Sequence, residues 1–481
     1  MINIKTTIVS RFKVNKVFVI YLISFSVATS IVVSLWLRDL ETIVGVFFFI
    51  VSTTFLFSYI WSTLYSGRIE YKRAIGLYYF LVFVSILLIM LFTLLYDRTF
   101  SRYFDYGTFL YSLASPVFLS GVVSGLVLGD RSYVFVVLNT AIVSFLFSYD
   151  MPFLSEVVML TSIVAGETVL LRKGAQSLFN SIIAGSGALL FFVISLMLIE
   201  RIDTYIALFA PFSSAITVLF STYAMLPLIE SLFGVVTQIK LLEYANISHP
   251  LLKELIDKAP GTYNHSMIVS FLAEAASYEV GADPVLAKVG ALFHDIGKLK
   301  NPKYFIENSG SVSTHEKLSP AMSRLIIMSH VRDGVELAKK YALPKCIIDI
   351  VEQHHGTTLI RYFYEKAKRI SKEEVPEEIY RYPGPKPRTK EAAIVMMADS
   401  IEAAVRSLND PTPAKIKEVI RAIVNYLFSD GQFDECPLNL RELKTISDVF
   451  LKMLISFYHR RVSYPGVSDG GNGGSSSGSK N

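Results

Sequence analysis

A series of long apolar runs in the first half of this chain constrains its fold more than any other feature. From residue 17 to about residue 236, these runs follow one another with only short polar breaks. Each run is close to the ~20 residues that a helix needs to cross the hydrocarbon layer of a membrane. We therefore predict about eight membrane-spanning helices, at residues 17–37, 43–65, 74–96, 107–129, 133–149, 154–171, 178–200 and 205–235.

Lysine and arginine are distributed unevenly between the two sides that these spans define. If the N-terminus is cytoplasmic, most basic residues fall in the inside segments, and the outside loops hold only Arg38, Arg98, Arg102 and Arg201. The positive-inside rule favours this orientation. Because an even number of spans returns the chain to its starting side, we predict a multi-pass protein of the plasma (inner) membrane with both termini in the cytoplasm.

These boundaries predict four segments. Residues 1–16 form a cytoplasmic N-terminus, residues 17–236 the transmembrane domain and residues 237–467 a cytoplasmic domain. Residues 468–481 form a Gly/Ser-rich tail, which cannot bury apolar surface and is expected to be disordered. The formal net charge of +5 averages an apolar half and an ordinary polar half. It gives no reason to expect a DNA or RNA polymer as a partner.

The second half is predicted to be almost entirely helical. Apolar residues recur at spacings of three and four, in several places after a proline that suits the first turn of a helix. The predicted helices cover residues 267–278, 284–293, 320–328, 334–341, 345–353, 389–407 and 413–427. The proline-rich stretch 372–390 is predicted to be a long loop. The fold class is therefore all-α: a polytopic transmembrane helical bundle followed by an all-helical cytoplasmic domain.

All eight histidines of the chain lie between His249 and His459. The two outermost suit cap or surface roles, whereas most of the others combine with aspartates in a pattern: His265, His294-Asp295, His330, His354-His355 and Asp399. Imidazole and carboxylate together suit borderline-hard divalent cations, and this set is larger than one tetrahedral ion can use. We predict a centre of two divalent metal ions, manganese or iron, in a hydrolase that needs no nucleophilic side chain.

Lys298 follows His294 by four positions and Asp295 by three, which places it on the same side of a helix that continues through these residues. There the Asp295 carboxylate can bridge two ions, and the Lys298 ammonium can meet a phosphate oxygen. Gly297 is expected to leave room for a ligand to approach. We predict that Asp295 and Lys298 are the catalytic pair.

Three segments, at residues 259–265, 294–308 and 353–357, resemble the seven-transmembrane HD family of phosphohydrolases. The resemblance implies that Asp295 bridges the metals and that Lys298 faces the scissile phosphate. It also implies the metal ligands His265, His294, Asp295, His330, His354, His355 and Asp399. Members usually carry a large extracellular domain between the first two spans. Here only residues 38–42 stand in its place, which puts an extracellular sensing role in doubt.

Studied members of that family hydrolyse cyclic di-AMP to linear pApA, so the resemblance implies a membrane-anchored phosphodiesterase that lowers the level of this second messenger. Two alternatives stay open: an HD hydrolase of cyclic di-GMP or ppGpp, and a non-catalytic membrane receptor for a nucleotide. The cyclic di-GMP type continues after its paired histidines with a Gly-Tyr-Pro signature, which this sequence lacks. A receptor would be expected to lack a metal ligand, and none is missing.

Further residues are predicted to contact the substrate. They are Lys298, Tyr304, His315, Lys317 and Tyr362. The tyrosines could stack on adenine, and His315 could either reach the nucleotide or order a loop. The predicted partners are a cyclic dinucleotide and the lipid bilayer, and a homodimer is left open.

Overall fold

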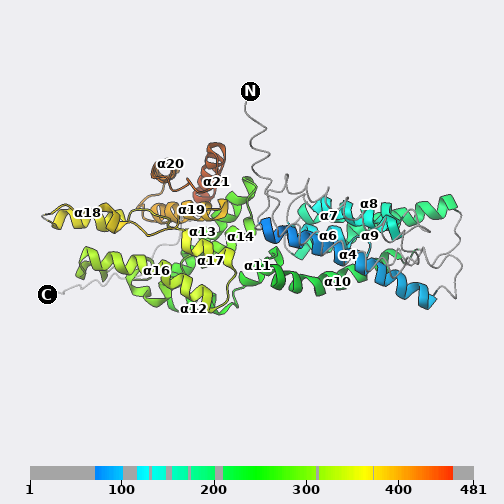
Figure 1. The fold of residues 1–481 in the computed structure, drawn as a ribbon. Coiled ribbons are helices and arrows are strands. Elements are labelled where there is room, and N and C mark those ends of the chain that lie inside the picture. The colour runs from blue at the N-terminus through cyan, green and yellow to red at the C-terminus, as the bar shows by residue number, and fades with distance from the viewer. Residues whose placement is uncertain are drawn as a thin grey trace, which may run out of the picture. The chain divides into compact units, whose positions relative to one another are not determined.

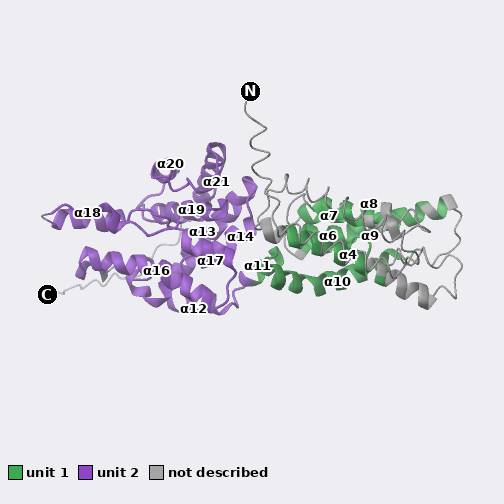
Figure 2. Ribbon diagram, viewed as in Figure 1, with its two compact units in different colours: residues 1–243 green, residues 244–481 purple. Residues whose placement is uncertain are grey.

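The computed structural model describes residues 71–100, 116–128, 133–147, 154–171, 175–200, 208, 210–309, 314–371 and 373–458. Within these residues the chain is helical, and a single isolated bridge between Leu359 and Arg381 pairs extended backbone. The all-α prediction is confirmed for this part of the chain. The chain divides into two compact units, residues 1–243 (unit 1) and 244–481 (unit 2), which Figure 2 colours separately.

Unit 1 is a bundle of apolar helices. Those described are α4 (Tyr71–Phe100), α6 (Leu119–Leu128), α7 (Tyr133–Phe147), α8 (Leu154–Leu171), α9 (Ala175–Glu200), α10 (Ala210–Phe233) and α11 (Gln238–Tyr244), the last of which ends at the first residue of unit 2 (Figure 1). The segment 1–16, the predicted spans 17–37 and 43–65, the start of the span 107–129, the tail 468–481 and His459 lie outside the described residues.

Small residues allow close packing inside unit 1. A side chain at Gly121 of α6 would collide with the backbone carbonyl of Ser162 on α8, so these helices approach at backbone distance. The hydroxyls of Ser120 and Ser162 lie 3.0 Å apart beside this contact. In a membrane the hydrophobic effect does not drive helices together, because lipid tails are as apolar as the side chains. Helices there usually associate through small residues, which allow close packing, and through hydrogen bonds between hydroxyl groups.

Large apolar side chains cover the outer faces of α9 and α10. Phe191 and Leu198 of α9 are 76% and 77% exposed, and Phe220 of α10 is 70% exposed. Among the described residues, two helical stretches, Gln176–Ser195 and Ala210–Phe233, are long and apolar enough to cross a membrane. The apolar stretches of the other helices are shorter: Ile75–Leu88, Leu119–Leu128, Tyr133–Ile142 and Val157–Leu170. Such exposed apolar faces are unusual in water and suit contact with lipid.

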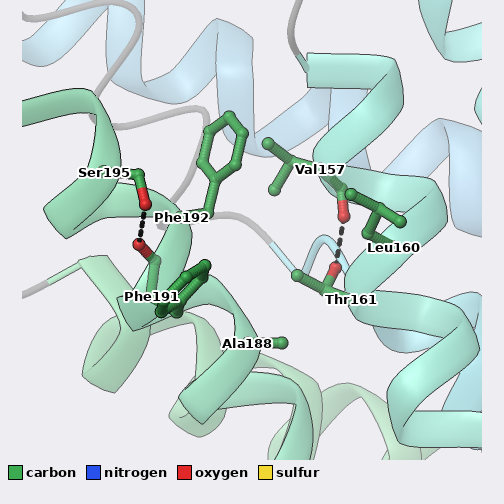
Figure 3. Close-up of a pocket in the computed structure, with 7 residues that line it drawn as sticks. All are labelled: Val157, Leu160, Thr161, Ala188, Phe191, Phe192 and Ser195. Atoms are coloured by element: carbon green, nitrogen blue, oxygen red, sulfur yellow. Dashed lines mark hydrogen bonds between the residues drawn. The ribbon is translucent and has the colours of Figure 1, made fainter. Parts of the chain in front are cut away.

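An apolar cavity of about 320 Å³ lies between α8 and α9 (Figure 3). The hydroxyls at its wall bond within their own helices: Thr161 donates to the carbonyl of Val157 at 2.5 Å, and Ser195 donates to that of Phe191 at 2.9 Å. The cavity therefore offers apolar surface and little hydrogen bonding. Its lining residues all belong to unit 1, whereas every histidine of the chain belongs to unit 2.

Unit 2 contains the helices α12 (Pro250–Lys258), α13 (Pro260–Glu279), α14 (Pro284–Phe293), α15 (Ile306–Ser309), α16 (Pro320–Lys340), α17 (Lys345–Gln353), α18 (Arg361–Ile370), α19 (Lys390–Arg406), α20 (Pro413–Ser429) and α21 (Leu440–Tyr458). Short 3-10 turns lie between them: η2 (Ile296–Lys300), η3 (Pro302–Tyr304), η4 (Thr314–Lys317) and η5 (Glu377–Tyr380). Proline opens α12, α13, α14, α16 and α20, where its missing N–H costs nothing.

The core of unit 2 forms around α19, whose residues from Ala392 to Ala398 are all buried. Helices α13, α14, α17 and α20 pack against it. Polar side chains cap several of these helices: the carboxylate of Asp283 accepts two backbone N–H groups at the start of α14, and the imidazole of His249 accepts that of Leu251 at the start of α12. The cap role predicted for His249 is confirmed.

The predicted break between residues 328 and 334 is wrong, because α16 runs unbroken from Pro320 to Lys340. Gly334, the predicted first residue of a second helix, lies inside α16 instead. Its backbone N lies against Gly297, and an added Cβ would meet the Val351 side chain at 3.0 Å. Here tight packing, rather than a helix boundary, requires the glycine.

Candidate metal centre

The predicted ligands come from five places in unit 2 and converge on one buried spot. His265 lies on α13, His294 and Asp295 follow the last residue of α14, His330 lies on α16, His354 and His355 follow α17, and Asp399 lies on α19. His355 is half-buried and the others are at most 8% exposed. Two groups could each hold an ion: His330, His354 and His355 (the triple-histidine group), and His265, His294 and Asp399 (the mixed group).

Gly297 permits the close contact that joins two of these elements. A Cβ at this position would overlap the backbone carbonyl of His330 and the backbone N of Gly334. The expectation that Gly297 leaves room for a ligand is therefore wrong: the space is occupied by α16. The helix expected to continue through Lys298 also ends earlier, at Phe293, and a 3-10 turn takes over at Ile296.

We expect Gly297→Ala to destabilise the protein by about 1–3 kcal/mol, because η2 and α16 would be forced apart. Thermal unfolding of the full chain in detergent should show a lowered midpoint and a reduced metal content. Gly187→Ala, at a helical glycine with nothing within 4 Å of the added Cβ, is the matched control and should not lower the midpoint. Equal midpoints for the two variants would contradict this account of the contact.

The two carboxylate oxygens of Asp295 face different groups. Its Oδ1 lies 3.4 Å from Nε2 of His330 and 3.8 Å from Nε2 of His354, both in the triple-histidine group. Its Oδ2 lies 3.2 Å from Nε2 of His294 and 3.8 Å from Nε2 of His265, both in the mixed group. One carboxylate is thus positioned to serve two ions, one through each oxygen.

Three imidazoles are oriented by the main chain. Nδ1 of His294 lies 2.6 Å from the carbonyl of Ala291, and Nδ1 of His330 and of His354 contact the carbonyls three residues earlier in the same way, at 2.5 and 2.7 Å. Because a carbonyl only accepts, each Nδ1 carries the proton, and each Nε2 of a neutral ring presents a lone pair to the centre.

The Nε2 lone pairs of these rings repel one another, and a metal ion between them would remove the repulsion. Nε2 of His330 and Nε2 of His354 lie 3.2 Å apart, and Nε2 of His294 is buried without a hydrogen-bond partner. Burial lowers the pKa of His330 and of His354, and neighbouring imidazoles lower that of His354 further, so both rings are neutral and their lone pairs face each other. A cation between such nitrogens removes the repulsion, so the donor set fits divalent metal ions.

The mixed group has a different electrostatic environment. Nε2 of His265 lies 3.0 Å from Oδ1 of Asp399, and its Nδ1 makes a short contact with Glu402. Burial disfavours the charged ring, but the hydrogen bonds with both carboxylates outweigh it and raise the pKa of His265 to about 9. A metal binding here would replace the proton on Nε2.

Lys298 lies at the edge of the centre, where its ammonium bonds with two carboxylates. Its Nζ is 2.7 Å from Oδ2 of Asp295 and 2.7 Å from Oε1 of Glu307, and it lies over the ring of Phe305. Burial disfavours its charge, but Asp295 and Glu307 raise its pKa, so the amine stays protonated. A protonated amine cannot bind a metal, but it can attract an anion held beside Asp295.

The other residues that were predicted to contact the substrate do not bond with the carboxylates of the centre as Lys298 does. His315 is buried, its Nε2 donates to the carbonyl of Tyr304 at 2.8 Å, and its ring packs on Phe363. It therefore orders a loop, which was one of its two predicted roles. Lys317 is exposed, and Tyr362 is 70% exposed and packs on Phe363.

Three residues beside the centre are not among the predicted site residues. Glu307 pairs with Lys298, Glu402 contacts His265, and the ring of Tyr382 stacks on His355 at 4.3 Å between centroids. Glu402 follows Asp399 by three positions on one helix, a spacing that could have revealed it. Tyr382 lies in the predicted proline-rich loop, whose path no periodicity encodes.

Residues 262–404 match the family model described as the HD domain, so the chain contains an HD domain. It is 44% identical over 316 residues to the cyclic-di-AMP phosphodiesterase PgpH of Listeria monocytogenes serotype 1/2a (strain 10403S), covering 66% of this chain and 43% of that protein. It is 48% identical over 242 residues to PgpH of Bacillus subtilis (strain 168), covering 50% of this chain and 34% of the relative. The chain thus spans less than half the length of these two relatives.

A solved structure also resembles part of the chain. The crystal structure of the L. monocytogenes phosphodiesterase PgpH HD domain in complex with cyclic-di-AMP is 51% identical, covers 45% of this chain and 100% of that one, and gives a TM-score of 0.43. A shorter likeness, 36% identity over 92 residues, links the chain to ribonuclease Y of Acholeplasma laidlawii (strain PG-8A), covering 19% of this chain and 13% of that enzyme.

Proposed function

We propose that this chain, whose residues 262–404 form an HD domain, is a metal-dependent phosphodiesterase that hydrolyses cyclic di-AMP to linear pApA. The observation that carries the proposal is the pair of ligand groups bridged by Asp295, because a phosphodiester is well matched to two adjacent cations. The names of the PgpH relatives favour cyclic di-AMP among the phosphodiesters.

In this proposal, two divalent ions, manganese or iron, supply the activation of water and the neutralisation of charge on the phosphate. The chain's own residues do the rest. His294, His330 and His354 present Nε2 lone pairs because their Nδ1 protons are held by backbone carbonyls. Lys298 turns its ammonium from Glu307 and Asp295 toward the phosphate, and the surrounding buried side chains exclude bulk water.

We propose further that unit 1 anchors the enzyme in a plasma (inner) membrane as a multi-pass bundle. The exposed apolar faces of α9 and α10 and the close packing at Gly121 support this. The distribution of basic residues supports cytoplasmic termini. The HD domain would then face the cytoplasmic pool of cyclic dinucleotide.

The test of function is a panel of substrates offered to the purified full chain in detergent with manganese or iron. The panel contains cyclic di-AMP, cyclic di-GMP, ppGpp and a short single-stranded RNA, the last because of the likeness to ribonuclease Y. We expect cyclic di-AMP to be cleaved with the highest kcat/KM and to give pApA. Preferred cleavage of another compound would assign a different substrate, and binding without cleavage would favour the receptor alternative.

The orientation of unit 1 gives a separate prediction. We expect a reporter fused after residue 467 to be labelled only from the cytoplasm, and a reporter inserted within residues 101–106, beyond the end of α4, to be labelled only from outside. The physical reason is that basic loops are retained on the cytoplasmic side. Labelling with the two sides exchanged would overturn the orientation.

A further inference from the structure

Glu402 is a fully buried carboxylate next to the candidate metal centre, with 0% of its surface exposed. It lies on α19 one turn after Asp399. Its Oε2 makes a short contact with Nδ1 of His265, and its Oε1 accepts a hydrogen bond from the hydroxyl of Tyr458 at 3.1 Å. The two oxygens therefore join the helix that carries His265 to the last residue of α21.

His265 is held differently from the three imidazoles described above. Those rings donate Nδ1–H to a neutral carbonyl of their own helix, a contact that helix geometry supplies. His265 has instead a charged partner 137 residues away in the chain. A carboxylate behind an imidazole fixes the proton on Nδ1 and increases the electron density on Nε2, which strengthens that nitrogen as a metal ligand.

The surroundings of Glu402 fit an ionised acceptor. Both of its partners, the Nδ1–H of His265 and the hydroxyl of Tyr458, are donors, and a guanidinium N of Arg406 lies 3.7 Å from Oε2. A buried charge is tolerated only where such partners satisfy it. Among the described residues, the contacts of Glu402 are with His265, Tyr458 and Arg406, whereas His330 and His354 bond with the main chain of their own helices.

We propose that Glu402 is a positioning residue that acts through Nδ1 of His265 and selectively strengthens the ion site of the mixed group. The proposal rests on the two-metal centre of the proposed function. The affinities of the two ions should therefore depend on Glu402 to different extents. The ion near His265 and Asp399 needs the Glu402 charge, and the ion of the triple-histidine group does not. Tyr458 takes part by holding the carboxylate in place from α21.

The experiment measures metal binding directly. Full-length protein in detergent is stripped with a chelator and titrated with Mn²⁺, and bound ions per chain and their affinities are determined for the parent and for Glu402→Gln. Glutamine keeps the size of the side chain and can still accept the Nδ1–H, but it has no charge. We expect the affinity of one ion to fall by about 10- to 100-fold while the other is unchanged. At limiting Mn²⁺ the variant should therefore hold one ion where the parent holds two.

Glu391→Gln is the matched control, because Glu391 is also a buried carboxylate on α19 but accepts from the backbone N of Asp283, away from the ligands. It should bind both ions like the parent. Tyr458→Phe, which leaves the Glu402 charge intact, should weaken the same single ion by less than tenfold. This second variant tests the proposal even where Glu402→Gln folds poorly.

The outcomes separate this inference from the proposed function. If the parent binds two ions and Glu402→Gln binds two with unchanged affinities, the role of Glu402 is overturned alone. Loss of both ions together in Glu402→Gln also overturns it, since that result indicates general support of the fold. A parent chain that binds no Mn²⁺ overturns the two-metal centre itself.

Discussion

Asp295→Ala is expected to abolish hydrolysis and to lower the bound metal, because one carboxylate faces both ligand groups. Its Oδ1 and Oδ2 are directed at nitrogens of different groups, so alanine removes a ligand from each ion at once. We expect a loss of at least about a thousandfold in rate, equivalent to about 4 kcal/mol of transition-state stabilisation. Single-turnover assays with saturating manganese and metal analysis of the purified variant measure the two effects.

Asp333→Ala is the control for this variant. Asp333 is a buried aspartate of the same unit, but its ion-pair partners are Lys300 and Arg332, neither of which is a predicted ligand. It should keep two ions and its activity, apart from a modest loss of stability. If Asp295→Ala keeps both ions and cleaves at the parent rate, the carboxylate does not bridge the centre.

Lys298→Ala is expected to separate catalysis from metal binding. The ammonium is protonated and lies 2.7 Å from Oδ2 of Asp295, where it can neutralise charge on a phosphate. Without it we expect both ions to remain and kcat to fall about a hundredfold, or roughly 2–3 kcal/mol, as for the loss of one charged donor to a transition state. The matched control is Lys300→Ala, since that lysine lies in the same turn but is half exposed and pairs with Asp333. It should cleave at the parent rate.

Removing Lys298 also leaves the carboxylate of Glu307 without its cation, and this could slow the reaction for an unrelated reason. Glu307 stays bonded with the hydroxyl of Thr262, near the start of the helix that carries His265. The double variant Lys298→Ala/Glu307→Gln removes the stranded charge. We expect it to be as slow as Lys298→Ala, because the phosphate still lacks its ammonium. Recovery to the parent rate would mean that the unpaired Glu307 carboxylate slows cleavage in Lys298→Ala, and that the loss of the ammonium from the phosphate does not.

Helices with strong local signals were the part of unit 2 that could be predicted. The bounds of α14 and α17 agree with the expected 284–293 and 345–353, because a cap or a proline marks each start and the apolar spacing is regular. By contrast α18 and α21 were not predicted, and of α12 only the start at Pro250, after the cap residue His249, was expected. The unbroken α16 could not be foreseen either, since only the tertiary contact of Gly334 with Gly297 shows that this glycine packs inside a helix and does not mark a helix boundary.

The sequence predicted which residues would form a metal centre, but it did not predict how these residues contact one another. Residue types and spacing indicated a metal centre, and the structure brings the seven residues together as two groups around Asp295. The pairing of Lys298 with Glu307, and the contact of His265 with Glu402, depend on how separate helices pack. Charged residues on a helix are usually solvated, so nothing local marks Glu307 as a partner of the centre. For Glu402 the only local signal is its spacing of three residues from Asp399 on one helix.

The wide separation of the ligands along the chain links the centre to folding itself. His265 and Asp399 are 134 residues apart, so an unfolded chain offers an ion no comparable set of donors. A ligand that binds only the folded state adds about 2.7 kcal/mol of stability when its free concentration is a hundred times its Kd. If the proposed function holds, withdrawal of the divalent ions would therefore shorten the lifetime of the folded domain against proteolysis as well as stop turnover. The abundance of the protein in a cell would then follow the metal supply.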